Sequence, residues 1–343
     1  MRSSTLLKWV TLSAAACCAG RMLLRKARRY DFHGKAVLIT GGSRGLGLLL
    51  ARQLAEEGAI VVICARDDAE LDAARKDVAR HGAEVIALRC DVTDRNQVQQ
   101  LVQEVVSRLG GIDVLINNAG IIQVGPMDEM TLEDFEQAMK VHYWAPLYTT
   151  LEALPHMRRC CQGRIVNIAS IGGKISVPHL LPYNASKFAL VGLSEGLRAE
   201  LQREGIYVTT VCPGTMRTGS PVHAEFKGQR EAEFTWFTVG ASLPVASISG
   251  ERAAREIIEA CRYGEAEVIL SLPAKAAALL HGVAPGLTSE ILAVANRLLP
   301  RPGGIGAAPA RGLESRPSWL PGWVTTLTDQ AARRNNELPA RAR

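Results

Sequence analysis

Residues 183–187 read YNASK and place a tyrosine and a lysine four positions apart. On a helix, side chains with this spacing lie on the same face. A free phenol has a pKa of about 10 and a lysine ammonium of about 10.4, and a nearby positive charge lowers the pKa of the phenol. The pair could therefore give or take a proton near neutral pH, although the same spacing also occurs by chance on helical surfaces.

The length and composition of the chain favour an α/β protein. Its 343 residues are enough for one large domain with additions or for two smaller ones, and 47% of them are apolar. Glycine is frequent, with 31 residues, whereas aromatic residues make up only 5%. The eight cysteines include two adjacent pairs, and others lie in apolar runs. In a chain of this length they do not resemble a disulfide framework, so we expect reduced thiols.

The net charge of +6 is unevenly distributed along the chain. Residues 1–35 carry eight Lys/Arg and one acid, and residues 301–343 carry seven Arg and three acids, so the middle of the chain is acidic. A basic body would have indicated nucleic-acid binding, which this distribution does not favour. Basic ends on an acidic body indicate either contact with an anionic membrane surface or solvated tails.

Short β-branched apolar runs alternate with longer helical patterns through the middle of the chain. The predicted strands cover residues 35–40, 59–65, 84–90, 114–117, 164–170, 207–212 and 267–272. This alternation predicts a Rossmann-type, doubly wound parallel sheet with helices on both faces. We assign residues 30–272 to a single catalytic domain. Residues 1–29 form an apolar and basic N-terminal segment, 273–300 an apolar helical extension, and 301–343 a Pro/Gly-rich linker and charged tail that we expect to be disordered.

A glycine-rich turn follows the first predicted strand. Ligands bind beyond the carboxyl ends of the strands in such sheets, and the segment TGGSRGLG, residues 40–47, lies at this point. Its glycines let the backbone turn tightly and approach a phosphate, and the start of the next helix supplies amide donors. A plain glycine-rich turn is the alternative. The residues predicted to bind a dinucleotide here are Gly41, Ser43, Arg44, Gly45, Leu46 and Gly47.

The second predicted strand ends in Ala65 and Arg66, where folds that prefer NAD usually carry an acid for the ribose 2′-hydroxyl. Arg66 together with Arg44 would suit a 2′-phosphate, so the sequence favours NADP(H) over NAD(H). Asp67 and Asp68 weaken this preference. Arg66 could instead be a solvated residue at the start of a helix.

Several other predicted strands also end in small or polar residues. These ends are CDVTD at 90–94, NNAG at 117–120, Ser170, and PGTMRT at 213–218. Over residues 35–270 the chain resembles the short-chain dehydrogenase/reductase family, because these motifs occur in the family's order. The matching motifs are the TGxxxGxG turn, Asp91 with Val92, Asn117-Asn118-Ala119-Gly120, Ser170 with Tyr183 and Lys187, and Pro213-Gly214 with Thr218.

The resemblance implies the chemistry of the YNASK segment. Lys187 would hold the nicotinamide ribose and lower the pKa of Tyr183. Tyr183 would then exchange a proton with a carbonyl or alcohol oxygen that Ser170 hydrogen-bonds. The resemblance also implies a homo-oligomer and no metal. It places these further residues at the cofactor: Asp91, Val92, Asn118, Ala119, Gly120, Tyr183, Lys187, Pro213, Gly214 and Thr218.

One position departs from the family pattern. The family commonly has an asparagine in the helix before the serine strand, where it helps hold a water in a proton relay to the lysine. Here the matching residue is His142, after Val141. An imidazole can also donate or accept a hydrogen bond, and it titrates near neutral pH. His142 is therefore a candidate catalytic residue, with a packed helix histidine as the alternative.

Three functions remain open at this point. The leading one is an NADP(H)-dependent carbonyl reductase or alcohol dehydrogenase. The second is an NAD-dependent alcohol dehydrogenase, and the third is a non-enzymatic, membrane-bound dinucleotide sensor. In the family the long segment 219–249 usually covers the substrate. Its aromatic residues, Phe226, Phe234, Trp236 and Phe237, could line an apolar pocket for a lipophilic substrate or form a small core of their own.

The chain ends suggest where the protein resides. The apolar segment 6–24 has an uncharged stretch of residues 9–20, shorter than the roughly twenty residues that a spanning helix needs. A basic cluster follows it, formed by Arg25, Lys26, Arg28 and Arg29. We expect a membrane-associated protein with its catalytic domain on the cytoplasmic side, because positive charge stays there. A soluble cytoplasmic protein with a disordered or helical leader is the alternative.

Overall fold

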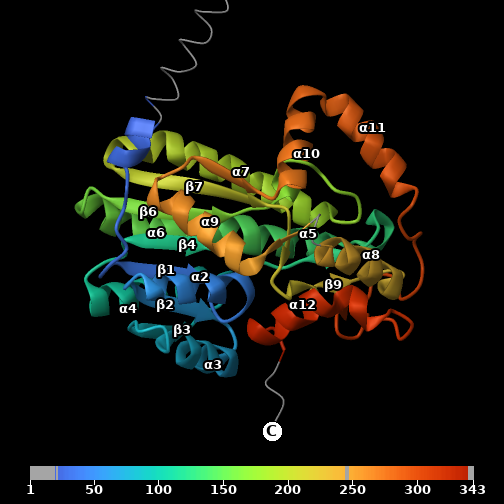
Figure 1. Ribbon diagram of the computed structural model, residues 1–343, viewed down its shortest axis with the longest axis horizontal. Coiled ribbons are helices and arrows are strands. Elements are labelled where there is room, and N and C mark those ends of the chain that lie inside the picture. The colour runs from blue at the N-terminus through green and yellow to red at the C-terminus, as the bar shows by residue number, and fades with distance from the viewer. Residues whose placement is uncertain (1–19, 21, 244–246, 339–343) are drawn as a thin grey trace, which may run out of the picture.

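The structure is a computed structural model that describes residue 20, residues 22–243 and residues 247–338. Its centre is a seven-stranded sheet with the order β11-β7-β6-β4-β1-β2-β3 (Figure 1). All neighbouring pairs in this sheet are parallel, which confirms the predicted fold class. Its strands are β1 (Ala36–Thr40), β2 (Ile60–Ala65), β3 (Val85–Arg89), β4 (Val114–Asn117), β6 (Gly163–Ile168), β7 (Ile206–Pro213) and β11 (Glu267–Leu270).

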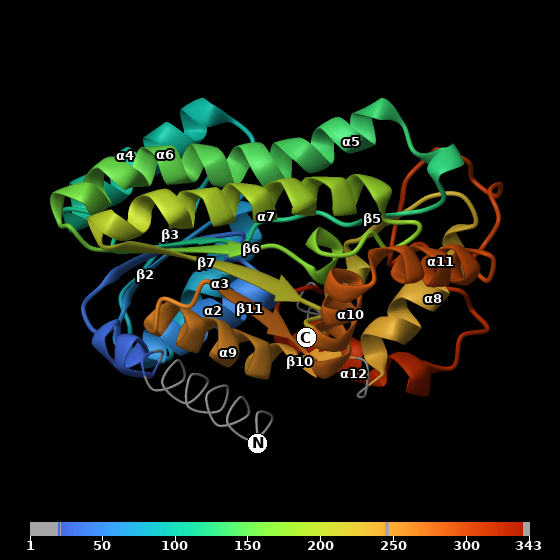
Figure 2. The ribbon, with the colours of Figure 1, turned by 90° about the horizontal axis from the view of Figure 1, so that it is seen from above.

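Helices cover both faces of the sheet (Figure 2). One layer holds α2 (Gly45–Glu56), α3 (Asp68–Ala79) and α9 (Gly250–Arg262). The other holds α4 (Arg95–Leu109), α5 (Leu132–Met139), α6 (Ala145–Arg159) and α7 (Leu181–Leu201). Strand β1 serves both layers, since Val37 and Ile39 join one hydrophobic cluster and Leu38 joins the other. Alternate side chains of a strand point to opposite faces, so a strand buried on both faces is apolar throughout.

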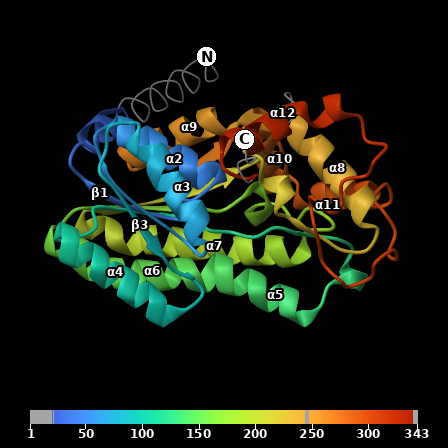
Figure 3. The same cartoon turned by 90° about the horizontal axis from the view of Figure 1, so that it is seen from below.

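A second group of elements lies at one end of the sheet (Figures 1 and 3). It holds the helices α8 (Arg230–Ser242), α10 (Leu272–Val283), α11 (Pro285–Asn296) and α12 (Gly322–Arg334). Its strands form two small sheets, β10 (Ser247–Ser249) with β8 (Thr215–Arg217), and β12 (Ala310–Arg311) with β9 (Glu225–Phe226) and β5 (Gln123–Val124). Short turns complete the described chain: η1 (Met127–Glu129), η2 (Lys140–Trp144), η3 (Ile171–Gly173), η4 (Gln202–Glu204) and η5 (Ser220–Val222).

The expectation of a disordered tail over residues 301–343 is wrong for its described part, residues 301–338. Ala310 pairs with Phe226 in the small sheet, and Thr328 of α12 hydrogen-bonds Ser242 of α8 at 2.7 Å. Leu320 and Val324 pack in the hydrophobic cluster that contains Phe226 and Phe234. The segment is poor in apolar residues, but other parts of the chain supply the partners that order it.

The predicted membrane segment lies mostly outside the described residues. Residues 22–27 are helical, and Met22, Leu23 and Leu24 are exposed. Within the part of the chain that the structure describes, no helix combines the length and hydropathy needed to cross a bilayer. The described cysteines are free thiols, as expected, and four of them are buried: Cys64, Cys90, Cys212 and Cys261.

Candidate active site

The glycine-rich turn after β1 is held by the loop that follows β4. The hydroxyl oxygen of Thr40 accepts the backbone amides of Asn118 at 3.0 Å and Ala119 at 3.1 Å. The Asn118 side chain donates to the carbonyls of Thr40 and Gly41, both at 3.0 Å. A Cβ on Gly47 would lie 2.2 Å from the Gly41 carbonyl oxygen, so only glycine allows this close approach. Two motifs from distant parts of the sequence therefore form one rigid unit.

Asn117 has a structural role that its place in the motif does not reveal. It is 3% exposed, and its amide donates to the Asn167 side chain of β6 at 2.8 Å. Its oxygen accepts from Thr149 at 2.7 Å, and Asn167 in turn donates to Ser194 at 2.8 Å. This buried network fixes β4, β6, α6 and α7 against one another beneath the site, because each buried polar atom in it has a partner.

The structure brings Ser170, Tyr183 and Lys187 together. Ser170 follows β6, and its side chain caps η3 by accepting the amide of Gly172 at 3.0 Å. Its hydroxyl also hydrogen-bonds the phenol of Tyr183. The Lys187 ammonium lies 5.6 Å from the centroid of the Tyr183 ring and donates to the Ile168 carbonyl at 2.8 Å. The spacing that suggested one helix face therefore reflects a real juxtaposition on α7.

Burial determines the proton affinities of this pair. It raises the pKa of Tyr183 above its ordinary value, although the hydrogen bond from Ser170 acts in the opposite direction. Burial also lowers the pKa of Lys187 to about 7. The expectation of a lowered phenol pKa is wrong for this structure. Removal from water disfavours both the phenolate and the ammonium, and it is the largest cause of each shift.

His142 lies beneath the tyrosine on the π-helical turn η2 and is 1% exposed. Its Nε2 accepts the amide of Ile121 at 3.1 Å, just beyond the NNAG motif. Its Nδ1 lies 2.8 Å from the Ser186 hydroxyl, which donates to the Tyr183 carbonyl at 2.8 Å. These partners place the proton on Nδ1. Both ring nitrogens are thus engaged, and the imidazole packs edge-on to the Tyr183 ring at 5.3 Å between centroids.

The pKa of His142 lies well below its ordinary value, because the ring is buried and Lys187 is nearby. The Ile121 amide donates to the Nε2 lone pair, which protonation of the ring would remove, so this hydrogen bond also favours the neutral imidazole. The imidazole is therefore neutral at neutral pH, contrary to the expectation that it titrates there. Ser186 and Ile121 were not singled out by their sequence, because neither residue type carries a chemical signal of its own.

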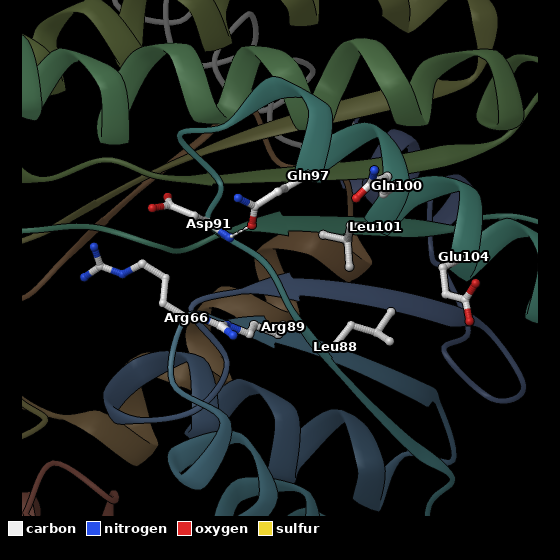
Figure 4. Close-up of a pocket in the computed structure, with 8 residues that line it drawn as sticks. All are labelled: Arg66, Leu88, Arg89, Asp91, Gln97, Gln100, Leu101 and Glu104. Carbon is white, nitrogen blue, oxygen red and sulfur yellow. Dashed lines mark hydrogen bonds between the residues drawn. The ribbon is translucent and has the colours of Figure 1, made fainter.

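Two of the residues predicted to bind the dinucleotide line the same pocket (Figure 4). Arg66 and Asp91 line one pocket of about 720 Å³ between β3 and α4. Arg66 is exposed, whereas the Asp91 carboxylate accepts the amide and hydroxyl of Thr93 at 3.0 and 2.8 Å. Val92 is buried beside it. The neighbouring Asp67 caps α3 by accepting the amide of Glu70 at 2.8 Å, so a helix cap accounts for this acid.

Arg44 is less available than Arg66. Its guanidinium pairs with Glu70 at 2.9 Å and with Glu337, from the end of the chain, at 3.5 Å. Ser43 is buried and also donates to Glu70, at 3.1 Å. Of the two arginines that favoured a 2′-phosphate, one is already engaged by two carboxylates.

The segment after β7 completes the crevice. Pro213 ends β7, and the amide of Gly214 donates to the Leu270 carbonyl at 3.2 Å. A Cβ on Gly214 would lie 2.7 Å from the Ser271 hydroxyl oxygen, which explains the glycine. Thr218 is buried, and its carbonyl accepts from the side chain of Asn335 at 3.1 Å. The residues Asn335, Asn336 and Glu337 were missed from the sequence, since nothing in a charged terminal stretch indicates contact with motifs more than 100 residues away.

The turn has the form of a diphosphate cradle. Gly41 and Gly45 have positive φ values of 64° and 56°. Helix α2 begins at Gly45, and Leu46 is buried in its first turn. Helix α2 has no acid in its first turn and no side-chain cap, so its N-terminal end can attract an anion, although the Gly45 amide already donates to the Asn335 carbonyl at 2.9 Å. Gly120 approaches His142 closely, since a Cβ on Gly120 would lie 3.2 Å from the Nε2 atom of His142. These residues fit a nicotinamide dinucleotide.

Comparisons with known proteins agree with this geometry. The short chain dehydrogenase family matches residues 35–226. A "Dehydrogenase/reductase SDR family protein 7-like" of Anopheles gambiae is 34% identical over 273 residues, which are 78% of this chain and 84% of that protein. A "Ketoacyl reductase HetN" of Nostoc sp. is 36% identical over 239 residues, which are 69% of this chain and 79% of that protein.

A solved structure shows the same architecture. The L-sorbose reductase of Gluconobacter frateurii, crystallised with NADPH and L-sorbose, superimposes with a TM-score of 0.64 at 26% sequence identity. The match covers 71% of this chain and 97% of that one. The parallel sheet, the ordered motifs and these relatives lead to one conclusion: the chain belongs to the short-chain dehydrogenase family of oxidoreductases.

Proposed function

We propose that residues 30–272 catalyse NADP(H)-dependent hydride transfer between the nicotinamide and a carbonyl or alcohol substrate. The observation that carries this proposal is the convergence of Ser170, Tyr183 and Lys187 at the carboxyl edge of the sheet, with the Ser170 hydroxyl bonded to the phenol. The dinucleotide supplies the hydride, and the protein supplies orientation and a proton. A ketoacyl reductase among the relatives supports reduction of a carbonyl as the natural direction.

Each residue of the triad has a distinct task in this proposal. Tyr183 is protonated at neutral pH, as an ordinary phenol is, and its raised pKa extends that range, so the group that faces a carbonyl oxygen is a proton donor. Ser170 holds the same oxygen. Burial lowers the pKa of Lys187 to about 7, so the amine is close to half-protonated near neutral pH. Additional hydrogen-bond acceptors would stabilise its ammonium form. The ribose hydroxyls of the nicotinamide half are such acceptors.

Replacing Tyr183 with phenylalanine tests the catalytic role. The variant keeps the ring and loses the proton, so turnover should fall about 10²–10⁴-fold while NADPH still binds. Ketone-dependent NADPH oxidation and nucleotide binding by fluorescence provide the two measurements. Tyr148→Phe on α6 makes the same change away from the site and should be neutral. Wild-type turnover in Tyr183→Phe would remove this residue from the reaction.

Cofactor preference rests on Arg66 in this proposal. Its guanidinium is exposed in the adenosine pocket, and no carboxylate pairs with it in the described part of the chain. Arg44 is engaged by Glu70 and Glu337. An NAD-dependent alcohol dehydrogenase is the alternative, and the Glu70 carboxylate near Ser43 is the observation that favours it.

The Arg66→Asp variant separates these two cofactors. It would place a negative charge where a 2′-phosphate binds and offer an acceptor to a 2′-hydroxyl. The Kd for NADPH should rise about 10-fold to 100-fold, which corresponds to the loss of a charge-assisted hydrogen bond, while the Kd for NADH holds or falls. Arg75→Asp on α3 carries the same charge change outside the pocket as a control. An unchanged NADPH/NADH ratio would contradict the role of Arg66.

We propose that His142 is a positioning residue for the catalytic helix. It links the amide of Ile121 to Ser186, and through Ser186 to the carbonyl of Tyr183. A relay that depends on titration of the imidazole is not part of this proposal, because its pKa is far below neutral.

Variants of His142 distinguish positioning from titration. His142→Leu leaves the Ile121 amide unpaired and removes the group that donates to the Ser186 hydroxyl, so kcat should fall about tenfold or more. His142→Asn retains polar partners and should recover part of the loss. The pH profile of kcat/KM should keep its acidic limb in His142→Asn, because the lowered pKa already leaves wild-type His142 neutral at neutral pH. Loss of that limb in the asparagine variant would show that the imidazole titrates.

A lipophilic carbonyl compound is the substrate class that we infer. Tyr183 packs against a hydrophobic cluster that includes Val124, Leu180 and Phe226. Phe226 and Phe234 are buried in this cluster, and Trp236 and Phe237 are half-buried against it. Phe226 and Phe234 of segment 219–249 thus form part of a small core. The half-buried Trp236 and Phe237 remain available to contact a substrate. Turnover on a panel of ketones, aldehydes and 3-oxoacyl thioesters tests this inference.

We propose that the protein lies on a lipid surface through two regions on the same side of the molecule. Figure 1 shows the start of the described chain and the α10–α11 pair on its upper side. In α10 and α11 only Ala274 and Thr288 are buried. The exposed apolar residues there are Leu272, Leu279, Leu280, Val283, Leu287, Ile291 and Val294.

The charges of the N-terminal region divide between lipid and protein. Arg25 pairs with Glu265 at 3.2 Å, and Arg28 lies 5.2 Å from the centroid of the Tyr207 ring. Lys26 and Arg29 are exposed. Each basic residue near an anionic surface contributes about 1 kcal/mol, so the apolar helices must supply most of the affinity.

Vesicle sedimentation tests the lipid proposal. The full-length protein should sediment with vesicles of mixed neutral and anionic phospholipid. The double variant Val283→Gln/Leu287→Gln should bind at least about tenfold more weakly. Leu132→Gln removes an equally exposed leucine from α5 and serves as the control. Salt at about 1 M should weaken binding without abolishing it, because salt screens charge and leaves apolar contact intact. A protein that stays in the supernatant at low salt would contradict the proposal.

A homo-oligomer is a further inference from family membership. Trp144, Leu151 and Phe188 are exposed on the adjacent η2, α6 and α7, where a second copy could cover them. The sedimentation coefficient of the purified protein measures this directly.

A further inference from the structure

The end of the chain lies against the glycine-rich turn. Figure 1 shows the C-terminal end of α12 beside the start of α2. The Gly45 amide donates to the Asn335 carbonyl at 2.9 Å. The side chain of Asn336 donates to the Ser43 carbonyl at 2.9 Å and to the Glu70 carbonyl at 3.3 Å. Two backbone positions of the turn, Ser43 and Gly45, and one on the neighbouring helix α3, Glu70, are therefore covered by residues from the other end of the sequence.

The same short segment also contacts the motif after β7. The Asn335 side chain donates to the Thr218 carbonyl at 3.1 Å and is fully buried. Arg52 of α2 donates to the Arg334 carbonyl at 2.8 Å. A Cβ on Gly219 would lie 2.4 Å from the Cα atom of Ala332, so α12 approaches this motif closely as well. The segment thus bridges the two motifs between which a dinucleotide binds in the proposed function.

Glu337 stands where a phosphate would bind. The second glycine of a dinucleotide-binding turn is needed because the diphosphate approaches its backbone closely. Here that glycine is Gly45, and a Cβ added to it would lie 2.5 Å from the Oε1 atom of Glu337. The carboxylate lies at the start of α2, an end of the helix that favours an anion.

The groups around this carboxylate are few and of mixed charge. The Oε2 atom of Glu337 lies 3.5 Å from Nε of Arg44 and 3.4 Å from Nε2 of His223. Arg44 also pairs with Glu70. The His223 ring also donates to the Glu337 carbonyl at 2.8 Å. The side chain is 4% exposed, and burial raises its pKa to about 8, an effect that Arg44 only partly offsets. The Glu337 side chain is therefore mostly protonated at neutral pH, and its ionisation above about pH 8 would leave an incompletely paired buried charge.

We propose that the segment Asn335, Asn336 and Glu337 is an internal competitor for the diphosphate of the dinucleotide and must leave the glycine-rich turn before the cofactor binds. This proposal rests on the proposed dinucleotide-dependent function. Departure of Glu337 frees the anion-binding end of α2 and leaves Arg44 with Glu70 alone. The position of the C-terminal segment then controls access to the cofactor site.

Glu337→Ala in the full-length protein tests the competition. The variant removes the side chain that lies against Gly45, so the self-bound state weakens. The Kd for NADPH, measured by nucleotide fluorescence, should fall about fivefold or more, the smallest effect typical of coupling between competing states. Glu290→Ala shortens the same side chain at an exposed position on α11 and should leave the Kd unchanged. An unchanged or higher Kd in Glu337→Ala would overturn the proposal.

Hydrogen exchange of the wild-type protein gives a second, independent measurement. The amides of Asn335 and Glu337 donate to the carbonyls of Ala331 and Ala332, both at 2.9 Å. Saturating NADPH should speed exchange at these two amides. Slower exchange would mean that the segment closes on the cofactor, which contradicts competition. If neither the wild type nor Glu337→Ala binds NADPH or NADH, the proposed function itself fails, and this inference fails with it.

Discussion

The cross-bonded loops after β1 and β4 are the constraint on which the site depends. The strand order reverses between these two neighbours, so a crevice forms at their carboxyl ends. Four hydrogen bonds between Thr40, Gly41, Asn118 and Ala119 close the base of this crevice. They satisfy backbone groups that would otherwise be orphaned in a buried place. They also set the distance between the glycine-rich turn and the NNAG motif.

From this unit a chain of hydrogen bonds runs to the catalytic helix. The loop after β4 continues into Ile121, whose amide binds His142, and Ser186 carries the contact to the Tyr183 backbone. The buried Asn117 and Asn167 fix the sheet beneath the same region. The dinucleotide turn and the tyrosine are therefore positioned by one continuous network, although they lie on opposite sides of the crevice.

Burial, more than proximity, determines the charges at the site. Lys187 and His142 are buried and Tyr183 is half-buried, and in each case burial is the first cause of the pKa shift. The neutral form of each group is favoured as a result. One pKa unit corresponds to about 1.36 kcal/mol, so a lysine whose pKa falls from 10.5 to about 7 is strongly affected by its surroundings. Added hydrogen-bond partners or charge can shift such a balance.

The sequence by itself determined the parallel sheet, its strands to within one or two residues, and the residues that converge at its carboxyl edge. These features follow from local patterns: apolar runs, glycines at fixed spacing, and a tyrosine four residues before a lysine. Only the tertiary structure decided the direction of the pKa shifts, because burial depends on every element that covers a group. It also decided that Asp67 is a helix cap, that Arg44 is shared by Glu70 and Glu337, and that residues 301–338 are ordered. Each of these outcomes depends on partners distant in the chain, such as Thr218 for Asn335 and Ser242 for Thr328, which no local pattern of residues can specify.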